Sequence, residues 1–179
     1  MASAFTHVVA AATLAAAATP SRALPRLIVV AAVCSVLPDA DVIGFRLGID
    51  YADPLGHRGV SHSLAIAAVT AAIATPLLFR GEAWEGLRLR IAGVLFVATA
   101  SHGLFDAMTD GGLGVAFFWP VDSTRHFLPF RPVAVSPIGV AAFFTERSLD
   151  VLRTEAVWIV LPWTLLCALL RIAVRESRP

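Results

Sequence analysis

Long apolar runs dominate the chain, and polar, proline or arginine residues separate one run from the next. Five such segments are present, at residues 2–19, 24–38, 62–79, 90–108 and 155–174. Because a bilayer core about 30 Å thick needs roughly 20 mostly apolar residues per helix, these segments predict transmembrane helices. The second segment is short for a full span, so we expect it to tilt or to thin the membrane locally.

A long connection rich in glycine and proline separates the fourth segment from the fifth, between Asp110 and Arg153. Residues 136–145 inside it are apolar but too few to span the bilayer. The predicted fold class is therefore an all-α integral membrane protein. We expect a bundle of about five transmembrane helices with a re-entrant or interfacial segment after the fourth, forming a single domain over residues 1–179.

Composition supports a membrane protein and argues against two other classes. Hydrophobic residues make up 58% of the chain and charged residues only 15%, against the ~25% charged residues of a typical soluble domain. The formal net charge is +1, so no basic surface for nucleic acid is predicted. Cys34 and Cys167 lie in apolar segments and are interpreted as small buried hydrophobic residues, with a disulfide as the open alternative.

The arginines, which are the chain's only basic residues apart from histidine, indicate an orientation. With five spans, eight arginines lie on the side of the first and third connections and the C-terminus, and six lie on the other side. Four of those six belong to the single long connection. Because positive charge close to helix ends is retained in the cytoplasm, the first side is predicted to be cytoplasmic.

Histidine and aspartate residues gather at one end of the predicted bundle. One comes from the start of the first helix, two follow the second, two precede or begin the third, and two end the fourth. Since consecutive helices alternate in direction, all of them lie on one face, which the arginines predict to be non-cytoplasmic. Scattered structural polar residues have no reason to choose one side. The set is His7, Asp39, Asp41, His57, His62, His102 and Asp106.

Each of these residues also has an ordinary structural interpretation. Asp39 and Asp41 could form a solvated turn after the second helix, and His62 could help to cap the third. His102 and Asp106 are four residues apart and could form a local pair on one helix face. Ionisable groups in a spanning segment are costly, however, and usually mark a functional site.

Taken together, the residues form a ligand set for a divalent metal ion. Imidazoles and carboxylates bind zinc, manganese or iron, whereas metals that prefer thiolates are not favoured. The set could hold one ion, or two ions about 3.5–4 Å apart that share a carboxylate. A dense anionic cluster at a membrane face is costly without a cation. The first candidates for ligands are Asp39, Asp41, His62, His102 and Asp106, followed by His7 and His57.

Spaced motifs carry a resemblance to a known family. They are Leu37-Pro-Asp-Ala-Asp41, His57-Arg-Gly-Val-Ser-His-Ser63 and Ser101-His-Gly-Leu-Phe-Asp-Ala-Met-Thr-Asp-Gly111, with Thr6-His7, Phe118-Trp-Pro120 and Ser136-Pro-Ile-Gly139. In this order they resemble the YdjM-like family of inner-membrane proteins, some of them LexA-regulated. The resemblance implies a membrane-bound metal-dependent hydrolase of the bacterial inner membrane. The chain departs from the common family pattern at Gly103 and at Asp110-Gly111, which argues against Asp110 as a ligand.

The predicted function is therefore a metal-dependent hydrolase that acts at the membrane interface on a lipid or another phosphate ester or ester. One or two divalent ions (zinc, manganese or magnesium) would lower the pKa of a bound water and polarise the scissile group. Arg58 and His57 are the candidate catalytic residues. Arg58 could hold an anionic substrate group by a bidentate contact, or it could form an ion pair with Asp39 or Asp41.

Two rivals come from another functional class: a membrane protein with a structural metal, and a metal-ion transporter. A transporter usually places its ligands near mid-membrane, often on broken helices. Here the ligands lie at one end, and the first, third and fifth helices are expected to lack buried charges at their centres. A structural site fills every coordination position with protein ligands, whereas a catalytic site keeps one open for water. Membrane lipids are the expected surroundings, and the sequence leaves the oligomeric state open.

Overall fold

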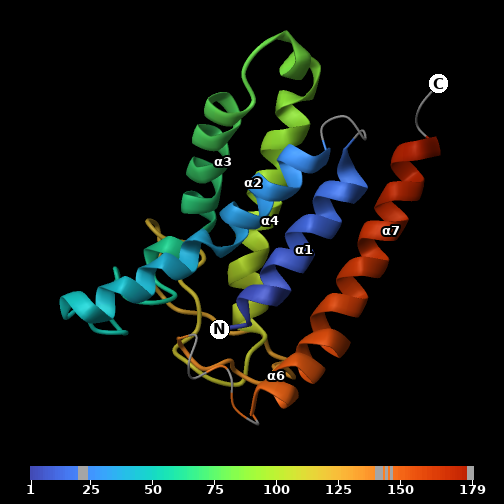
Figure 1. Cartoon of the computed structure of the whole chain (residues 1–179). Coiled ribbons are helices and arrows are strands. Elements are labelled where there is room, and N and C mark those ends of the chain that lie inside the picture. Colours follow the sequence, from blue (N-terminus) through green and yellow to red (C-terminus); the bar gives the residue numbers. More distant parts are fainter. Residues whose placement is uncertain (20–23, 140–142, 144, 146, 177–179) are drawn as a thin grey trace.

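The regular structure is helical, and the prediction of an all-α membrane protein is confirmed (Figure 1). The computed structural model describes residues 1–19, 24–139, 143, 145 and 147–176. Within these residues the backbone forms two isolated β-bridges and no strand. Three helical runs are long and apolar enough to cross a membrane, and two shorter apolar helices accompany them.

The α-helices are α1 (Ala4–Ala18), α2 (Leu24–Val36), α3 (Leu64–Leu78), α4 (Arg88–Ala107), α6 (Arg147–Glu155) and α7 (Leu161–Glu176). Short 3₁₀ helices are η2 (Leu37–Leu47), η3 (Val60–His62) and η4 (Glu82–Leu87), and the π-helical turn η5 (Ala156–Val160) joins α6 to α7. The three long runs are Leu24–Leu47, Glu82–Ala107 and Arg147–Val174.

Serine side chains begin the two short helices. Ser3 Oγ accepts a hydrogen bond from Thr6 N at 3.4 Å, and Ser63 Oγ accepts one from Ile66 N at 3.2 Å. α1 and α3 contain 15 residues each, which corresponds to about 22 Å. This length is below the ~30 Å of a bilayer core. Neither helix alone can reach both membrane surfaces.

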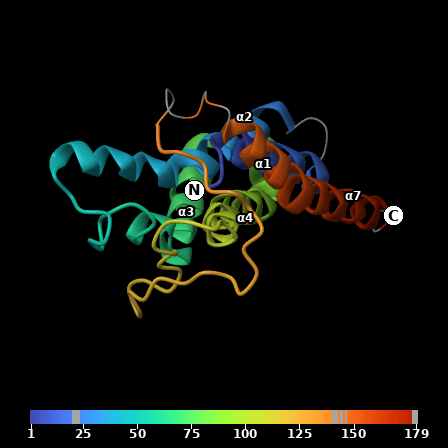
Figure 2. The ribbon, with the colours of Figure 1, turned by 90° about the horizontal axis from the view of Figure 1, so that it is seen from below.

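The second helical run does not end at the predicted position. Pro38 stands in the first turn of η2, where a missing backbone N–H does not interrupt the helix. The run therefore continues to Leu47, and Gly48 ends it with φ 76°. η2 extends away from the bundle (Figures 1 and 2). Asp39 and Asp41 lie in its first turns, where the chain leaves the bundle, and not in a turn after a helix stop.

The last helical run begins earlier than predicted. It starts at Arg147 and continues through the π-helical turn into α7. Glu155 therefore lies inside the run, and it is buried with 1% of its surface exposed. Glu155 is the first residue of the predicted fifth segment, and no charged residue lies between it and Arg171, so the expectation of no buried charge at the centre of this helix is not contradicted. The predicted re-entrant segment at residues 136–145 lies partly outside the described residues.

Small side chains allow the bundle helices to pack closely. Ala11 and Ala15 of α1, Ala31 of α2 and Ala98 of α4 belong to one buried cluster, with larger residues such as Leu95 between them. Small residues at helix interfaces are typical of membrane bundles, because they let the backbones approach. α4 lies at the centre and contacts α1, α2 and α3, whereas α7 packs on α1.

One end of the bundle receives every histidine and aspartate of the predicted set. The start of α1, the end of α2, the start of α3 and the end of α4 meet there (Figure 1). The connection after α4 covers the same end (Figure 2). Two of its contacts join it to the residues beneath: Ala116 N donates to Arg58 O, just before η3, at 3.0 Å, and Leu128 N donates to Ala107 O, at the end of α4, at 3.0 Å.

Candidate metal centre

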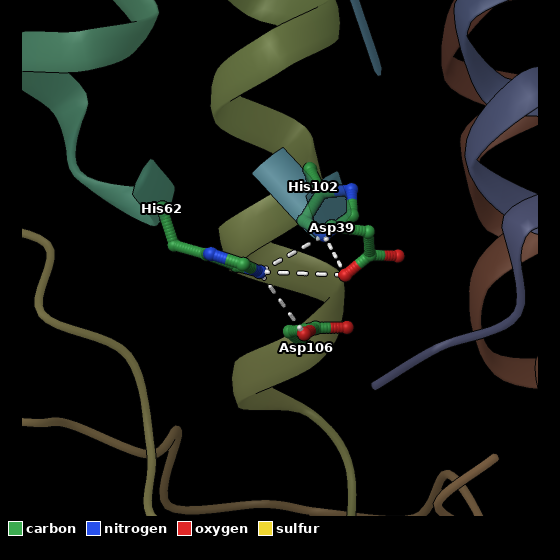
Figure 3. A group of neighbouring side chains, drawn as sticks. All are labelled: Asp39, His62, His102 and Asp106. Carbon is green, nitrogen blue, oxygen red and sulfur yellow. Dashed lines mark hydrogen bonds and ion pairs between the residues drawn. The ribbon is translucent and has the colours of Figure 1, made fainter. Parts of the chain in front are cut away.

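Four side chains from three elements converge at this end of the bundle (Figure 3). His102 and Asp106 lie one turn apart on α4, Asp39 comes from η2, and His62 ends η3. His102 Nε2 is 3.1 Å from His62 Nε2 and 3.2 Å from Asp39 Oδ1. His62 Nε2 is 3.7 Å from Asp39 Oδ1 and 3.7 Å from Asp106 Oδ2. One ligand atom from each residue therefore borders a common point.

The hydrogen bond on the far side of His102 assigns its proton. His102 Nδ1 lies 2.7 Å from the carbonyl oxygen of Ser35, which can only accept. Nδ1 therefore carries the proton, and Nε2 of the neutral ring presents a lone pair to the cluster. A histidine held in this way by a carbonyl or carboxylate is the usual arrangement behind a metal ligand.

His62 is held in the same way by Asp41. His62 Nδ1 is 3.2 Å from Asp41 Oδ2, and Ser61 Oγ donates to the same oxygen at 2.5 Å. Nδ1 of His62 therefore carries a proton, and Nε2 faces His102. With both rings neutral, two imidazole lone pairs and two carboxylate oxygens point at one another, which is unfavourable without a positive charge between them.

The side-chain charges of the cluster also favour a cation. Asp39, Asp41 and Asp106 supply three negative charges, and Arg58 supplies one positive charge beside Asp106. With neutral histidines these side chains carry two net negative charges in a largely buried volume. The Met1 amino group lies close enough to Asp106 to interact with its charge, but burial lowers the pKa of that amino group and so opposes its positive form. Because buried charge is stable only when it is compensated, the donor set and the charge both fit one divalent ion.

In the absence of a metal, a proton supplies part of this charge. Burial alone would lower the pKa of His62, but its hydrogen bonds to Asp39 and Asp41 outweigh burial and raise the pKa to about 9. The imidazole is therefore doubly protonated near neutral pH when no metal is bound. A proton on Nε2 and a metal ion at the cluster centre are alternatives, because both use the same lone pair.

Asp41 joins this cluster to a second group made of Asp41, His57 and His62. Its Oδ1 is 2.7 Å from His57 Nδ1, while its Oδ2 faces His62. His57 is fully buried, and its Nε2 has no hydrogen-bond partner among the described residues. Asp41 thus orients two imidazoles at once, and each of them keeps one ring nitrogen for another partner.

His7 lies against the opposite face of His102. The two rings are stacked with their centroids 3.8 Å apart and 16° between their planes. His7 Nε2 is 3.7 Å from Asp106 Oδ1, and neither ring nitrogen has a hydrogen-bond partner within the described part of the chain. A buried imidazole without such partners is uncommon, which is consistent with a ligand at the edge of the cluster.

Arg58 is fully buried and forms an ion pair with Asp106. Its Nε donates to Asp106 Oδ2 at 2.9 Å, Nη2 donates to Thr109 Oγ1 at 2.8 Å, and Nη1 donates to Gly111 O at 2.8 Å. The alternative of an ion pair is therefore realised, with Asp106 as the partner and neither Asp39 nor Asp41.

The backbone around Arg58 is unusual for a residue with a side chain. Arg58 has φ 64°, in the left-handed region that few non-glycine residues adopt. Gly112 has φ 90°, and a Cβ there would lie 2.7 Å from Arg58 Nη1 and 2.6 Å from the Tyr51 hydroxyl. Only glycine fits at position 112, because the guanidinium occupies the space beside it.

All seven histidine and aspartate residues predicted from the sequence are brought together, and Arg58 lies beside them. Sequence reasoning missed the partners that orient them, namely the Ser35 carbonyl, the Ser61 hydroxyl and Thr109. Their signal is weak: Ser61 is next to His62 in the motif, but a backbone carbonyl carries no sequence signature. Whether each residue binds a metal stays a prediction.

Residues 1–178 match the family described as YdjM inner membrane protein. The inner membrane protein YbcI of Escherichia coli (strain K12) is 38% identical over 150 residues, which cover 82% of this chain and 83% of YbcI. No solved structure matches the chain. The family is the one that the spaced motifs resemble, and the chain belongs to the YdjM inner membrane protein family.

Proposed function

We propose that the protein is a metal-dependent hydrolase of the inner membrane that acts on a lipid or another phosphate ester or ester at the membrane interface. One observation carries the proposal. The two Nε2 atoms of His62 and His102 face each other at 3.1 Å with carboxylate oxygens of Asp39 and Asp106 beside them. Such a set of acceptors needs a proton or a metal ion between its members, and a divalent ion matches the donor atoms and the charge of all four residues together.

His62, His102, Asp39 and Asp106 would hold the ion, with His7 as a further ligand. Two imidazoles and two carboxylates suit zinc or manganese better than a metal that prefers thiolates. When bound, such an ion lowers the pKa of a water ligand and polarises the scissile group. Asp41 and the Ser35 carbonyl keep the two imidazoles in the tautomers that ligation requires.

His57 is the proposed proton acceptor. Asp41 Oδ1 accepts a hydrogen bond from Nδ1–H of His57 at 2.7 Å, which leaves the lone pair of the ring on Nε2. A carboxylate behind a histidine orients the ring and stabilises its protonated form, as in other acid–base pairs. The same group could instead hold a second ion, and the metal content of the protein distinguishes the two roles.

Arg58 acts on the centre through Asp106. Nε, Nη1 and Nη2 each donate to a buried acceptor, and the side chain is closed off from solvent. This arrangement supports a positioning role, in which Arg58 fixes the Asp106 carboxylate toward His62. It gives less support to direct binding of an anionic substrate group.

A structural metal and a metal transporter are the rival functions. Asp39 Oδ2 and His57 Nε2 are buried without a hydrogen-bond partner among the described residues. Free polar atoms beside the four-residue cluster favour a site that takes up further groups, whereas a structural site is filled by protein. The position of the cluster at one end of the bundle also argues against a mid-membrane transport site.

Metal analysis tests the proposal. The purified protein in detergent should retain about one or two divalent ions per chain, and His102→Ala and Asp39→Ala should each lose most of them. His126→Ala is the matched control, because this histidine lies outside the cluster with 40% of its side chain exposed. The metal-loaded protein should hydrolyse p-nitrophenyl phosphate, and the two cluster variants should not. Retention of the metal by both variants would contradict the proposed centre.

A further inference from the structure

The metal centre is closed by buried side chains on most of its sides. His57, Arg58, His102 and Asp106 have no exposed surface. Asp39 and Asp41 are the exceptions among the carboxylates, with 12% and 6% of their side chains exposed. A substrate therefore meets the centre along the edge formed by these two aspartates.

A small cavity lies next to this edge, and we call it the notch. It has a volume of about 120 Å³ and lies where the start of η2, the short η3 and the first turns of α3 meet α4. Its walls are Leu37, Pro38, Ser61, Ile66, Thr70 and Thr99. Pro38 directly precedes Asp39, and Ser61 directly precedes His62. The inner wall of the notch is therefore the chain that carries the candidate ligands.

The outer side of the notch continues into the apolar surface of the helices. Along the continuous run of α2 and η2, Val29, Val33 and Leu37 are spaced by four residues, so they share one helix face. They are exposed to 63%, 57% and 49%. On α3, the face of Ile66 and Thr70 continues as the exposed residues Ile73 and Leu77. In a membrane protein such exposed apolar stripes contact lipid chains, so the notch lies at the end of two lipid-facing surfaces.

We infer that the substrate enters sideways from the bilayer through the notch, and that it is a membrane lipid with its ester at the bilayer surface. This inference rests on the proposed hydrolase function and names its substrate class. The acyl chains stay against the apolar faces of α2 and α3, and the head group passes Ser61 and Thr70 to reach Asp39. Hydrolysis of the phosphate ester then consumes one water. The water oxygen bonds to phosphorus, the bond between phosphorus and the glycerol oxygen breaks, and one proton of the water ends on that glycerol oxygen, which leaves inorganic phosphate and a diacylglycerol.

The test compares hydrolysis of a phosphate ester that is embedded in a membrane with hydrolysis of a phosphate ester that is dissolved in water. Metal-loaded protein is reconstituted in phosphatidylglycerol vesicles that contain phosphatidic acid, and its activity is compared with that on p-nitrophenyl phosphate in solution. Thr70→Leu adds bulk at the notch. It should lower the rate on phosphatidic acid by about tenfold, the effect of a small steric change in an apolar pocket. The metal content should be unchanged, and the loss on p-nitrophenyl phosphate should be clearly smaller, because this soluble ester has no acyl chains to place beside the notch. Thr164→Leu, the same substitution at an exposed position of α7, should change none of these.

A second measurement does not depend on turnover. A photoreactive phosphatidic acid with a diazirine in its acyl chain should label the peptides that contain Leu37 or Ile66, and Thr70→Leu should reduce this labelling. Labelling of α7 alone would overturn lateral entry, as would equal losses on both substrates with Thr70→Leu. Wild-type protein that hydrolyses p-nitrophenyl phosphate but not phosphatidic acid would overturn the lipid inference and leave the hydrolase proposal standing. Metal-loaded protein inactive on both would overturn the hydrolase proposal itself.

Discussion

Each carboxylate of the centre serves more than one partner. Asp106 Oδ2 accepts from Arg58 and faces His62, and its Oδ1 accepts from Ala2 N at 2.6 Å and lies near His7. Asp41 divides its two oxygens between His57 and His62. Because the partners are shared, the loss of one group is expected to disturb several others.

Arg58→Lys tests the positioning role of this arginine. Lysine keeps the positive charge beside Asp106 but cannot make the two further hydrogen bonds of the guanidinium, to Thr109 Oγ1 and Gly111 O. Two lost hydrogen bonds of about 1 kcal/mol each should lower the free energy of unfolding by about 2 kcal/mol. Metal affinity should fall as well. Unfolding in SDS measures the change in stability, and metal titration measures the change in affinity.

Arg153→Lys is the control for this substitution, because 76% of the Arg153 side chain is exposed. It should leave stability and metal affinity unchanged. The competing role for Arg58, direct binding of a substrate anion, predicts another pattern: Arg58→Lys would raise KM and leave stability and metal affinity as in the wild type.

Metal binding should release a proton from His62. The pKa of His62 is raised to about 9 by Asp39 and Asp41, so below that pH the ring must lose a proton before Nε2 can bind a metal. The apparent affinity for Mn²⁺ should therefore rise by about tenfold per pH unit around neutral pH and level off above pH ~9. Calorimetric titration in buffers of different ionisation enthalpy measures the released proton directly. An affinity independent of pH would show that His62 is not a ligand.

Residue spacing predicts part of this centre and not the rest. His102 and Asp106 share a face because they are four residues apart on a helix, and the alternation of helices brings the other motifs to the same end. The partner of Arg58 could not be predicted. It depends on the left-handed backbone at Arg58 and on the fold of a connection that has little regular structure. The contact between His102 and the Ser35 carbonyl could not be predicted either, because it depends on how α2 is rotated about its axis.

Three side chains of the last helical run join it to α1. Glu155 accepts from Ser3 Oγ at 2.6 Å and Thr6 Oγ1 at 2.7 Å, and Trp163 Nε1 donates to Ala10 O at 2.9 Å. Arg171 Nη1 donates to Ala16 O at the other end of α1. A carboxylate at a helix N-terminus and a cation at its C-terminus both complement the helix dipole. The last run thus provides hydrogen-bond partners for polar groups at both ends of α1, a helix that is too short to reach both membrane surfaces.

Glu155→Ala tests this connection between the helices. It removes the acceptor of two buried hydroxyl groups at the start of α1, on Ser3 and Thr6, which lie four residues and one residue before His7. Because hydrogen bonds to a charged group are worth about 1.5–3 kcal/mol each, unfolding in SDS should require about 3 kcal/mol less free energy. Asp150→Ala removes an acidic residue of α6 whose side chain is 71% exposed, and it should leave stability unchanged. If the two variants had the same free energy of unfolding, the hydrogen bonds of Glu155 to α1 would not stabilise the protein.

Hydrophobic patterning predicts the number and type of the helices better than their limits. Five apolar segments correspond to the five principal helical runs. The second run passes its predicted end because proline is tolerated in the first turn of η2. The last begins earlier because α6 is amphipathic, and its charged residues Arg147, Asp150 and Arg153 hide it from a search for apolar residues.

At the scale of the whole molecule, the bundle places the candidate centre at the end opposite the connection between α3 and α4 (Figure 1). The arginines predict that the centre faces away from the cytoplasm. A lipid-phase substrate would then come from the outer leaflet of the inner membrane. The proposed location of the reaction therefore depends on whether each helix crosses the membrane, including the 15-residue α3.

Single cysteines on either side of α3 test this orientation. Asp53 precedes α3 and Glu85 follows it, and both are exposed. In intact cells a membrane-impermeant maleimide should label Asp53→Cys, and it should label Glu85→Cys only after permeabilisation. The native Cys34 and Cys167 are buried, so the wild-type chain is the unlabelled control. The reverse pattern would place the centre at the cytoplasmic face. Labelling of both variants from outside would mean that α3 does not cross the membrane, and the alternation that predicts a common face would then fail at that helix.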